Sequence, residues 1–294
     1  MSININKAAN LGFCTGVRHA MDIITKAAME RGGIETLGAL VHNRQVMQKL
    51  GTLGVTIVDN LVLVQGDVVV ISAHGASPDT GEAIKQRGLK AIDTTCAFVK
   101  RAQSAAKKLA ADGFCVVVFG DVNHPEVRGI LGWADGQGLA TLNACDIGRL
   151  PEMPRRLGLL SQTTQIPSDF NSFIKDVLDL AFTKDAEIRI IDTICHETRA
   201  RQAETLSLAR SSDLVLVIGG RSSANTKRLY ELCATVADTR LIETAADIDP
   251  AWLDGKSDIG ITAGTSTDNE TIEEVAVRLA ELSRLASSAG LESR

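Results

Sequence analysis

The sequence predicts an α/β protein built from three similar lobes. Short apolar runs of strand character alternate with helical stretches, and a segment that carries a cysteine recurs three times along the chain. A length of 294 residues also exceeds the roughly 100 to 200 that are typical of one domain, which favours several compact units. We therefore expect βαβ units that are grouped into three lobes.

Five apolar runs precede glycine or polar loops and have the composition of buried parallel strands: 68–71, 115–119, 188–191, 214–218 and 259–262. Between them lie stretches rich in Ala, Leu, Lys and Arg with helical spacing, including 99–111, 197–209 and 226–237. This alternation is typical of parallel sheets whose strands are joined by helices.

The internal repeat is centred on three cysteines. Residues 92–96 read Ile-Asp-Thr-Thr-Cys and residues 191–195 read Ile-Asp-Thr-Ile-Cys, and a helix rich in Ala, Arg and Gln follows each of them. Residues 12–18, Gly-Phe-Cys-Thr-Gly-Val-Arg, also bring a cysteine from a strand and turn into a helix. Each lobe is therefore expected to supply one thiol.

The spacing after these cysteines repeats as well. A polar residue at a strand end follows each cysteine, 28 positions later at His42 and His124, and 30 positions later at Asn225. Each lobe offers one further polar strand-end loop, at 72–75, 161–164 and 263–266. Because ligands gather at the carboxyl ends of parallel strands, these loops are candidates for a binding site.

The cysteines also set the expected lobe boundaries. We expect a first lobe over 14–96, a second over 97–195 and a third over 196–281, with the third completed by a strand from 1–13 and followed by a tail over 282–294.

Composition and charge exclude several classes of partner. The net charge of −5 is spread without a basic stripe, and seven Phe, two Trp and one Tyr offer few stacking surfaces, so nucleic acid is not an expected partner. The N-terminal segment and the apolar runs are too short for a signal peptide or a membrane span. We expect a cytoplasmic protein with no membrane partner.

Three of the six cysteines have the setting of metal ligands. A thiol at a helix N-terminus is favoured as the thiolate, which places its pKa below the free value of about 8.5. Cys14, Cys96 and Cys195 share this setting and suit either a four-iron four-sulfur cluster with one iron lacking a protein ligand, or a zinc ion with an open fourth position. The other three are interpreted as small buried side chains: Cys115, Cys145 and Cys233.

The polar strand-end residues predict an anion pocket with few Lys or Arg. Its candidate members are His42, His74, His124, Thr163, Ser223, Asn225 and Ser266. Hydroxyl, amide and imidazole donors, together with helix N-termini, suit a diphosphate group. Glu126 could donate protons if burial raised its pKa, although a glutamate that merely stabilises a helix start is an alternative. Asp93 and Asp192 are interpreted as caps of the turns that present two of the cysteines.

Taken together, the motifs resemble those of the 4-hydroxy-3-methylbut-2-enyl diphosphate reductase family. They run in consistent order from about Gly12 to Ser266 and read Gly-Phe-Cys-Thr-Gly-Val at 12–17, Val-His-Asn at 41–43, Ser-Ala-His-Gly at 72–75, Asp-Thr-Thr-Cys at 93–96, Asn-His-Pro-Glu at 123–126, Ser-Gln-Thr-Thr at 161–164, Thr-Ile-Cys at 193–195, Ser-Ala-Asn at 223–225 and Thr-Ala-Gly at 262–264.

The resemblance implies a trefoil of three α/β lobes with pseudo-threefold symmetry around a central iron-sulfur cluster. It implies reductive dehydroxylation of (E)-4-hydroxy-3-methylbut-2-enyl diphosphate to isopentenyl and dimethylallyl diphosphates, a step of the non-mevalonate isoprenoid pathway. One four-iron four-sulfur cluster per chain would have three cysteine ligands, Cys14, Cys96 and Cys195. A ferredoxin or flavodoxin would supply the electrons.

The resemblance also implies roles for the polar residues. Glu126, with Thr163 and His124, would deliver protons. The diphosphate would be bound by His42, His74, His124, Thr163, Ser223, Asn225 and Ser266.

The chain departs from the family pattern at three places. Ala97 stands where the family usually has proline, Ala224 replaces the middle serine of Ser-Ser-Asn, and Thr267-Asp268 replaces a proline-containing continuation. The alanine at 224 removes a hydroxyl worth on the order of 1 kcal/mol if its hydrogen bond is simply absent. Alternative hypotheses are a paralogue with another substrate, a non-catalytic iron-sulfur redox protein and a three-cysteine zinc hydrolase.

Overall fold

The structure is a computed structural model that describes residues 3–181 and 185–292. Its strands form three four-stranded sheets, and every strand pair within them is parallel. The chain divides into two compact units, one made of 1–15, 41–48 and 196–294, and the other of 16–40 and 49–195. Each unit is described by itself below.

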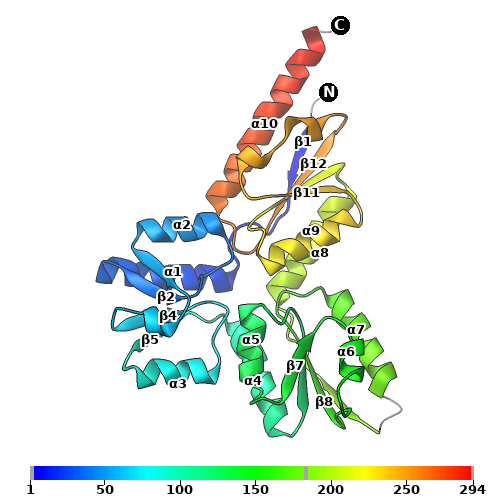
Figure 1. The fold of residues 1–294 in the computed structure, drawn as a ribbon. Helices are drawn as coiled ribbons and strands as arrows, with labels where there is room; N and C mark the ends of the chain where they lie inside the picture. The colour runs from blue at the N-terminus through cyan, green and yellow to red at the C-terminus, as the bar shows by residue number, and fades with distance from the viewer. Residues whose placement is uncertain (1–2, 182–184, 293–294) are drawn as a thin grey trace. The chain divides into compact units, whose positions relative to one another are not determined.

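The first unit contains one sheet, in the order β11-β10-β12-β1. Its strands are β11 (Asp238–Ile242), β10 (Leu214–Ile218), β12 (Asp258–Ala263) and β1 (Asn4–Lys7). Its main helices are α8 (His196–Arg210), α9 (Ala224–Ala234) and α10 (Asn269–Glu292), with 3-10 turns at Ala245–Asp247 and Pro250–Leu253. The N-terminal strand thus pairs with the last strand of the chain (Figure 1).

The second unit contains two sheets of the same topology. One has the order β3-β2-β4-β5, with β3 (Val55–Val58), β2 (Ile34–Leu37), β4 (Val68–Ile71) and β5 (Lys90–Asp93). The other has the order β7-β6-β8-β9, with β7 (Gly138–Thr141), β6 (Cys115–Phe119), β8 (Arg156–Ser161) and β9 (Glu187–Ile190). In each sheet the strand that comes first in the lobe is central, and the second strand lies at its outer edge.

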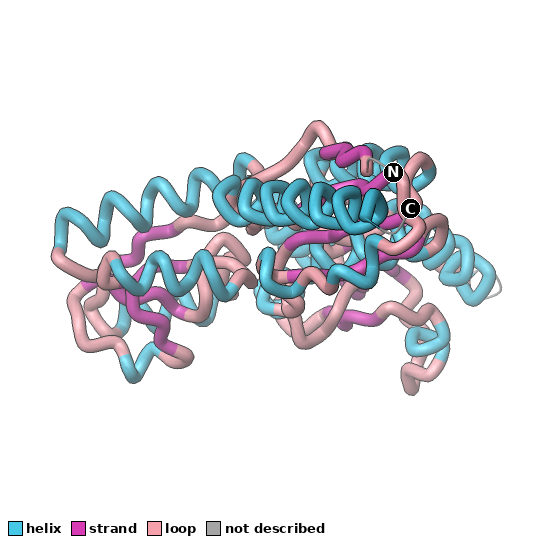
Figure 2. The backbone as a smooth tube through the Cα atoms, turned by 90° about the horizontal axis from the view of Figure 1, so that it is seen from above, coloured by secondary structure: helices cyan, strands magenta, loops and turns pink. Residues whose placement is uncertain are grey.

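Helices accompany these two sheets along the chain. They are α1 (Thr15–Arg31), α2 (Arg44–Thr52), α3 (Pro78–Gln86), α4 (Ala97–Ala111), α5 (Pro125–Gly132), α6 (Cys145–Gly148) and α7 (Pro167–Ala181), with a 3-10 turn at Leu61–Leu63. Figure 2 shows the strands of the sheets, in magenta, flanked by helices, in cyan. The prediction of an α/β protein with three similar lobes is confirmed.

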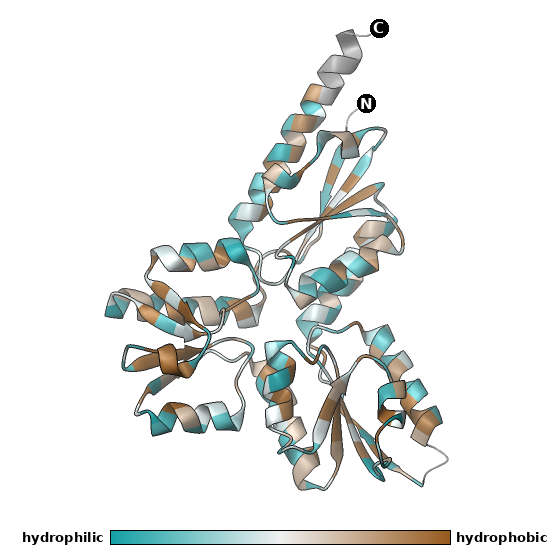
Figure 3. Cartoon of the chain, in the orientation of Figure 1, coloured by the Kyte–Doolittle hydropathy of each residue, from teal (hydrophilic) through white to brown (hydrophobic). Residues whose placement is uncertain are grey.

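The central strands β4, β6 and β10 are apolar throughout, as is typical of parallel strands that helices cover on both faces. Val116 and Val118 of β6 pack towards α4 and α5, whereas Val117 and Phe119 pack towards α6 and α7. Burying each such valine completely stabilises the fold by about 1.5–3 kcal/mol. Figure 3 shows hydrophobic residues, in brown, along the strands of the sheets.

The chain after position 282 differs in form from the tail expected there. The backbone continues α10 as far as Glu292, and 293–294 lie outside the described residues. Within the described ranges, no helix combines the length and the apolar character needed to cross a bilayer.

Candidate functional site

The same backbone hydrogen bond fixes each of the three predicted ligand cysteines. In every lobe the cysteine N–H donates to a carbonyl of the neighbouring strand-end loop: Cys14 to Thr265 at 3.1 Å, Cys96 to Ala73 at 3.1 Å and Cys195 to Thr163 at 3.0 Å. Each thiol is therefore presented at the carboxyl end of its own sheet, where a helix begins. The first unit carries Cys14, and the second carries the other two.

The turns that present two of the thiols are built alike. The Asp93 carboxylate accepts from the N–H of Thr95 at 2.9 Å, and the Asp192 carboxylate accepts from the N–H of Ile194 at 3.1 Å. The buried hydroxyls of Thr94 and its counterpart in the other lobe donate to carbonyls at the ends of β4 and β8. The interpretation of the two aspartates as turn caps is therefore confirmed.

The electrostatics around Cys96 fit a site for a cation or a metal cluster. The expectation of a lowered pKa is wrong for Cys96: burial raises the pKa of its thiol, and the negative charges of Cys195 and Glu126 raise it further. The N–H groups of Phe98 and Val99, at the start of α4, lower the same pKa because they donate to the thiolate. A soft metal would replace the thiol proton and offset the repulsion between two thiolates. The residues present therefore fit a thiolate-ligated group.

Glu126 is a buried carboxyl group that two donors hold in place. Only 3% of the residue is exposed, and the N–H and hydroxyl of Thr163 donate to its two oxygens at 2.6 and 2.9 Å. Burial raises the pKa of Glu126 to about 7, although the bonds from Thr163 oppose the rise. Such a carboxyl group is protonated in a substantial fraction of molecules near neutral pH, as a proton donor requires.

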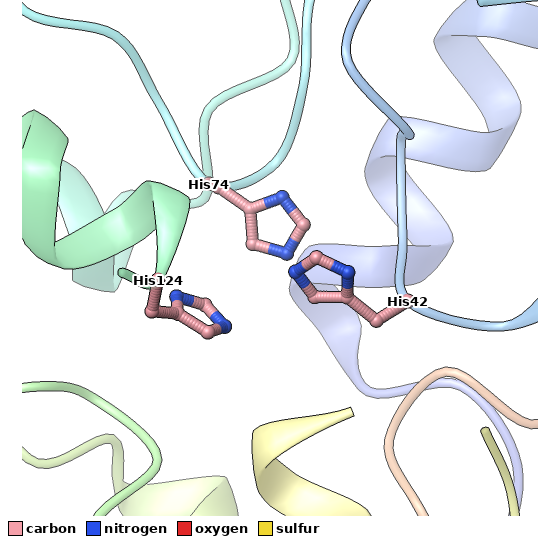
Figure 4. Close-up of side chains that lie close together, drawn as sticks. All are labelled: His42, His74 and His124. Carbon is pink, nitrogen blue, oxygen red and sulfur yellow. The ribbon is translucent and has the colours of Figure 1, made fainter. Parts of the chain in front are cut away.

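Two predicted histidines lie together in the second unit. The imidazole rings of His74 and His124 meet edge to face with centroids 5.4 Å apart, and Figure 4 shows them side by side. The Ser72 hydroxyl lies 3.3 Å from Nδ1 of His74, and Nδ1 of His124 accepts from the N–H of Glu126 at 3.2 Å. His124 therefore begins α5 and fixes the backbone of the buried glutamate. His42, also labelled in Figure 4, belongs to the first unit.

The first unit buries polar groups that have no protein partner. Asn225 is 2% exposed and Ser266 is 5% exposed, yet neither the amide of Asn225 nor the hydroxyl of Ser266 has a hydrogen-bond partner in the described chain. Leaving such groups unsatisfied costs about 1–3 kcal/mol each, which favours a polar ligand. Ser223 begins α9, where its hydroxyl accepts from the N–H of Thr226 at 3.3 Å.

Glycines allow close approach around these groups. A Cβ on Gly220 would lie 2.2 Å from the carbonyl oxygen of His42, and a Cβ on Gly264 would lie 2.1 Å from the hydroxyl oxygen of Thr226. Both distances are far shorter than van der Waals contact, so side chains are excluded. The His42 segment is thus packed directly on the loop that follows β10.

His42 is less readily protonated than an exposed histidine. Burial lowers its pKa, and the nearby cation of Lys227 lowers it further. The sequence predicted an anion pocket with few Lys or Arg, but Lys227 on α9 contributes a positive charge near His42. Sequence reasoning missed this lysine, although its place two positions after Asn225 was a usable signal.

Sequence reasoning also missed two buried polar residues behind the cysteine loops. Arg201 on α8 donates to the carbonyls of Gly12 and Ala263, both at 2.9 Å, and so joins the Cys14 turn to the loop after β12. Gln103 on α4 donates to the carbonyl of Ala76 at 3.4 Å. The helices that follow Cys96 and Cys195 are rich in Arg and Gln, and this composition could have indicated both residues from the sequence.

The remaining cysteines differ from one another. All six cysteines are thiols without a disulfide. Cys233 is fully buried in the core beside β10, where burial raises its pKa to about 12. Cys115 is partly buried in β6, and Cys145 is exposed at the start of α6, so the expectation of a buried Cys145 is wrong.

Comparisons with known proteins point to one family. The family model described as LytB protein matches residues 5–280. A protein named 4-hydroxy-3-methylbut-2-enyl diphosphate reductase from Dehalococcoides mccartyi is 56% identical over 96% of this chain and 99% of that protein. One of the same name from Geobacter metallireducens is 40% identical over 94% of this chain and 96% of that protein.

Two solved structures are also similar. The E-1-hydroxy-2-methyl-but-2-enyl-4-diphosphate reductase from Plasmodium falciparum has a TM-score of 0.88 at 26% identity, covering 94% of this chain and 87% of that one. A structure of (E)-4-hydroxy-3-methyl-but-2-enyl diphosphate reductase, described as the terminal enzyme of the non-mevalonate pathway, has a TM-score of 0.68 at 37% identity, covering 96% and 100%. With its sequence motifs, its three repeated lobes and these matches, the chain belongs to the LytB family of 4-hydroxy-3-methylbut-2-enyl diphosphate reductases.

Proposed function

We propose that the chain reduces (E)-4-hydroxy-3-methylbut-2-enyl diphosphate to isopentenyl and dimethylallyl diphosphates. The observation that carries this proposal is Glu126, a buried carboxyl group with its pKa raised to about 7 and held by Thr163 in the same unit as two of the thiols. The names of the relatives and the family supply the substrate class. Overall, two electrons and two protons convert the allylic alcohol of the substrate into water and an isopentenyl or dimethylallyl diphosphate that lacks the hydroxyl group.

A four-iron four-sulfur cluster would be held by Cys14, Cys96 and Cys195. When bound, the cluster would supply single electrons, and its fourth iron would have no cysteine ligand. The repeated hydrogen bond from each cysteine N–H supports this ligand set, because it gives the three thiols equivalent settings at helix starts. The turn hydrogen bonds at Asp93 and Asp192 hold the loops that carry two of these thiols.

Proton delivery is assigned to Glu126, with Thr163 and His124 as its supports. The hydroxyl and the N–H of Thr163 each donate to one carboxyl oxygen and so orient the group, and the proton that the protonated carboxyl carries can be donated to a substrate hydroxyl. His124 orients the start of α5 by accepting from the N–H of Glu126, and its ring also lies beside His74. One proton leaves with the hydroxyl as water, and the other is added to an allylic carbon.

We assign diphosphate binding to polar side chains that follow strands. They are His42, His74, His124, Thr163, Ser223, Asn225 and Ser266. The unpaired amide of Asn225 and hydroxyl of Ser266 support this assignment, since phosphate oxygens are acceptors that would satisfy their donor groups. A diphosphate would also raise the pKa of His42 from its lowered value, because an anion favours imidazolium.

The electrons would come from a ferredoxin or a flavodoxin, because the sequence carries no full nicotinamide-binding or flavin-binding motif. The test is a turnover assay on anaerobically purified protein with a reduced viologen and the substrate, in which the two products, which are isomers of equal mass, are distinguished by proton NMR. Formation of both products is expected. Absence of product from protein that carries its full cluster would contradict the proposed function.

A further inference from the structure

A large groove lies in the second unit, behind the turn that presents Cys96. Its volume is about 880 Å³, and it lies between α3 and α4 with Trp133 at one side. Four lysines line it, Lys85 on α3 and Lys100, Lys107 and Lys108 on α4. We call this surface the lysine groove.

The lysine groove is a local excess of positive charge on an acidic protein. The chain has a net charge of −5, yet four lysines face only two carboxylates here. Lys85 pairs with Glu82 and Lys100 pairs with Asp93, both at 2.7 Å. Among the described residues, no carboxylate pairs with Lys107 or Lys108, whose charges remain available to a partner.

The groove is joined directly to the proposed cluster site. Asp93 and Thr95 belong to its lining, and Cys96 is the next residue along the chain. Lys100 stands on the first turn of α4, the helix that Cys96 begins. Residues 93–96 therefore include two that line the groove, Asp93 and Thr95, and one proposed cluster ligand, Cys96.

The groove also has an aromatic side that extends its surface. The Trp133 indole N–H donates to the carbonyl of Ala76 at 3.1 Å, and the Lys107 ammonium lies 5.3 Å from the centroid of the Trp133 ring. A second hollow of about 650 Å³ shares Trp133, Lys107 and Pro78 with the groove, but its lining also carries Asp79 and Asp135, so the excess of positive charge is confined to the lysine groove. An aromatic side chain such as Trp133 is of a type that is enriched in protein interfaces, and lysines around it can steer an acidic partner.

We propose that the lysine groove is the docking surface for an acidic electron-transfer protein that reduces the cluster. This inference rests on the proposed function, which needs two electrons per turnover from an external donor. Each encounter transfers one electron from the reduced carrier, which leaves oxidised, so two encounters complete a turnover. Lys107 and Lys108 lie on α4, the helix that Cys96 begins, roughly 16–18 Å along its axis from Cys96, and would steer an acidic carrier to the face of α4 that leads to this proposed cluster ligand.

The test reverses the two unpaired charges with the double variant Lys107→Glu, Lys108→Glu of the cluster-loaded protein. With photochemically reduced acidic flavodoxin as the probe, kcat/KM for the carrier should fall by about tenfold or more at low ionic strength. The difference should shrink as salt is added, because screening removes the steering. Turnover with the methyl viologen radical should stay within about twofold of the unmodified protein, since a small cation gains nothing from lysine steering.

Two further variants serve as controls. Lys175→Glu reverses one charge on α7, which contributes no residue to the groove, and so makes half the charge change of the double variant; it should leave flavodoxin kinetics unchanged. Lys107→Gln with Lys108→Gln removes charge without reversing it and should give an intermediate loss. Flavodoxin kinetics that are equal in the double reversal, the neutral pair and the control would overturn the docking proposal, whereas a lack of viologen-driven turnover in the unmodified protein would overturn the proposed function instead.

Discussion

Replacing Glu126 by Gln separates proton delivery from binding. Glutamine has nearly the same size, its carbonyl oxygen can accept from the N–H of Thr163, and its amide can donate to the Thr163 hydroxyl. It cannot supply a proton. The variant should therefore keep the fold, the cluster and the substrate site, and lose only the step in which the hydroxyl leaves.

The expected loss of turnover is large. Positioned proton transfer contributes about 100- to 10,000-fold, which corresponds to roughly 3–5 kcal/mol of activation free energy. The pKa of about 7 adds a pH signature, because only the protonated carboxyl can donate. Turnover of the unmodified protein at saturating substrate should fall above about pH 7, approaching tenfold per pH unit, whereas the residual activity of Glu126→Gln should lack this dependence.

The same substitution has a stability signature that needs no substrate. The folded chain holds the Glu126 proton up to about pH 7, whereas an unfolded chain releases it near the usual value of 4.5. The folded state therefore binds more protons between these values, and the free energy of unfolding falls as pH rises, by about 3 kcal/mol for this group. We compare the free energies of unfolding of the cluster-free variant and the cluster-free unmodified protein. The value for Glu126→Gln minus that for the unmodified protein should be larger at pH 8 than at pH 4.5.

The assays are steady-state turnover with reduced viologen from pH 6 to 9, and urea unfolding of the cluster-free proteins at pH 4.5 and 8. A variant that turns over at close to the unmodified rate would refute the proton-donor role of Glu126. An unfolding free-energy difference between the two proteins that is the same at both pH values would refute the burial argument for its raised pKa.

Four other substitutions have definite outcomes. Cys195→Ser should lose iron and sulfide, as measured by metal analysis, because an oxygen ligand replaces a soft thiolate. Cys233→Ser should keep both, but its buried hydroxyl should lower the free energy of unfolding by about 1–3 kcal/mol, as measured by urea unfolding. Asn225→Ala should raise KM with little change in kcat, because it removes a donor to a group that hardly changes during reaction; an unaltered KM would contradict the assignment. Gly220→Ala should also raise KM, since its Cβ would lie 2.2 Å from the His42 carbonyl oxygen and must displace that segment.

The sequence predicted those strands whose hydrophobic signal is continuous. The runs at 68–71, 115–119 and 214–218 coincide with β4, β6 and β10, because strands covered on both faces by helices are apolar throughout. The edge strand β7 was missed, since it has four residues, Gly-Leu-Ala-Thr, of which only the last is buried, and leaves only a weak pattern.

The central strand β8 was missed for a different reason. Its sequence, Arg-Leu-Gly-Leu-Leu-Ser, has the leucines of a helix and a glycine that usually marks a loop. The glycine is required by packing, because a Cβ on Gly158 would lie 2.7 Å from a methyl carbon of Leu109 on α4. No local pattern reports a contact between residues that are so far apart in sequence.

The residues of the candidate site likewise divide into those that the sequence predicted and those that required the structure. Residues that recur in the repeat, such as Cys96 and Cys195, could be predicted because each lobe repeats the same turn before a helix. Arg201 and Lys227 could not, because their effects depend on which loops and charges the fold brings beside them. A raised pKa of Glu126 was predicted on the condition that the carboxyl is buried, but that burial, and the bonds from Thr163 that oppose the rise, required the structure.

We propose that Cys14, Cys96 and Cys195 together hold one iron-sulfur cluster that serves the reduction. Metal and sulfide analysis of anaerobically purified protein, with its paramagnetic spectrum recorded before and after substrate is added, tests this claim most directly. The account predicts about four irons and four sulfides per chain and a spectrum that the substrate perturbs. Stoichiometric zinc without iron, or a cluster spectrum that the substrate leaves unchanged, would contradict it.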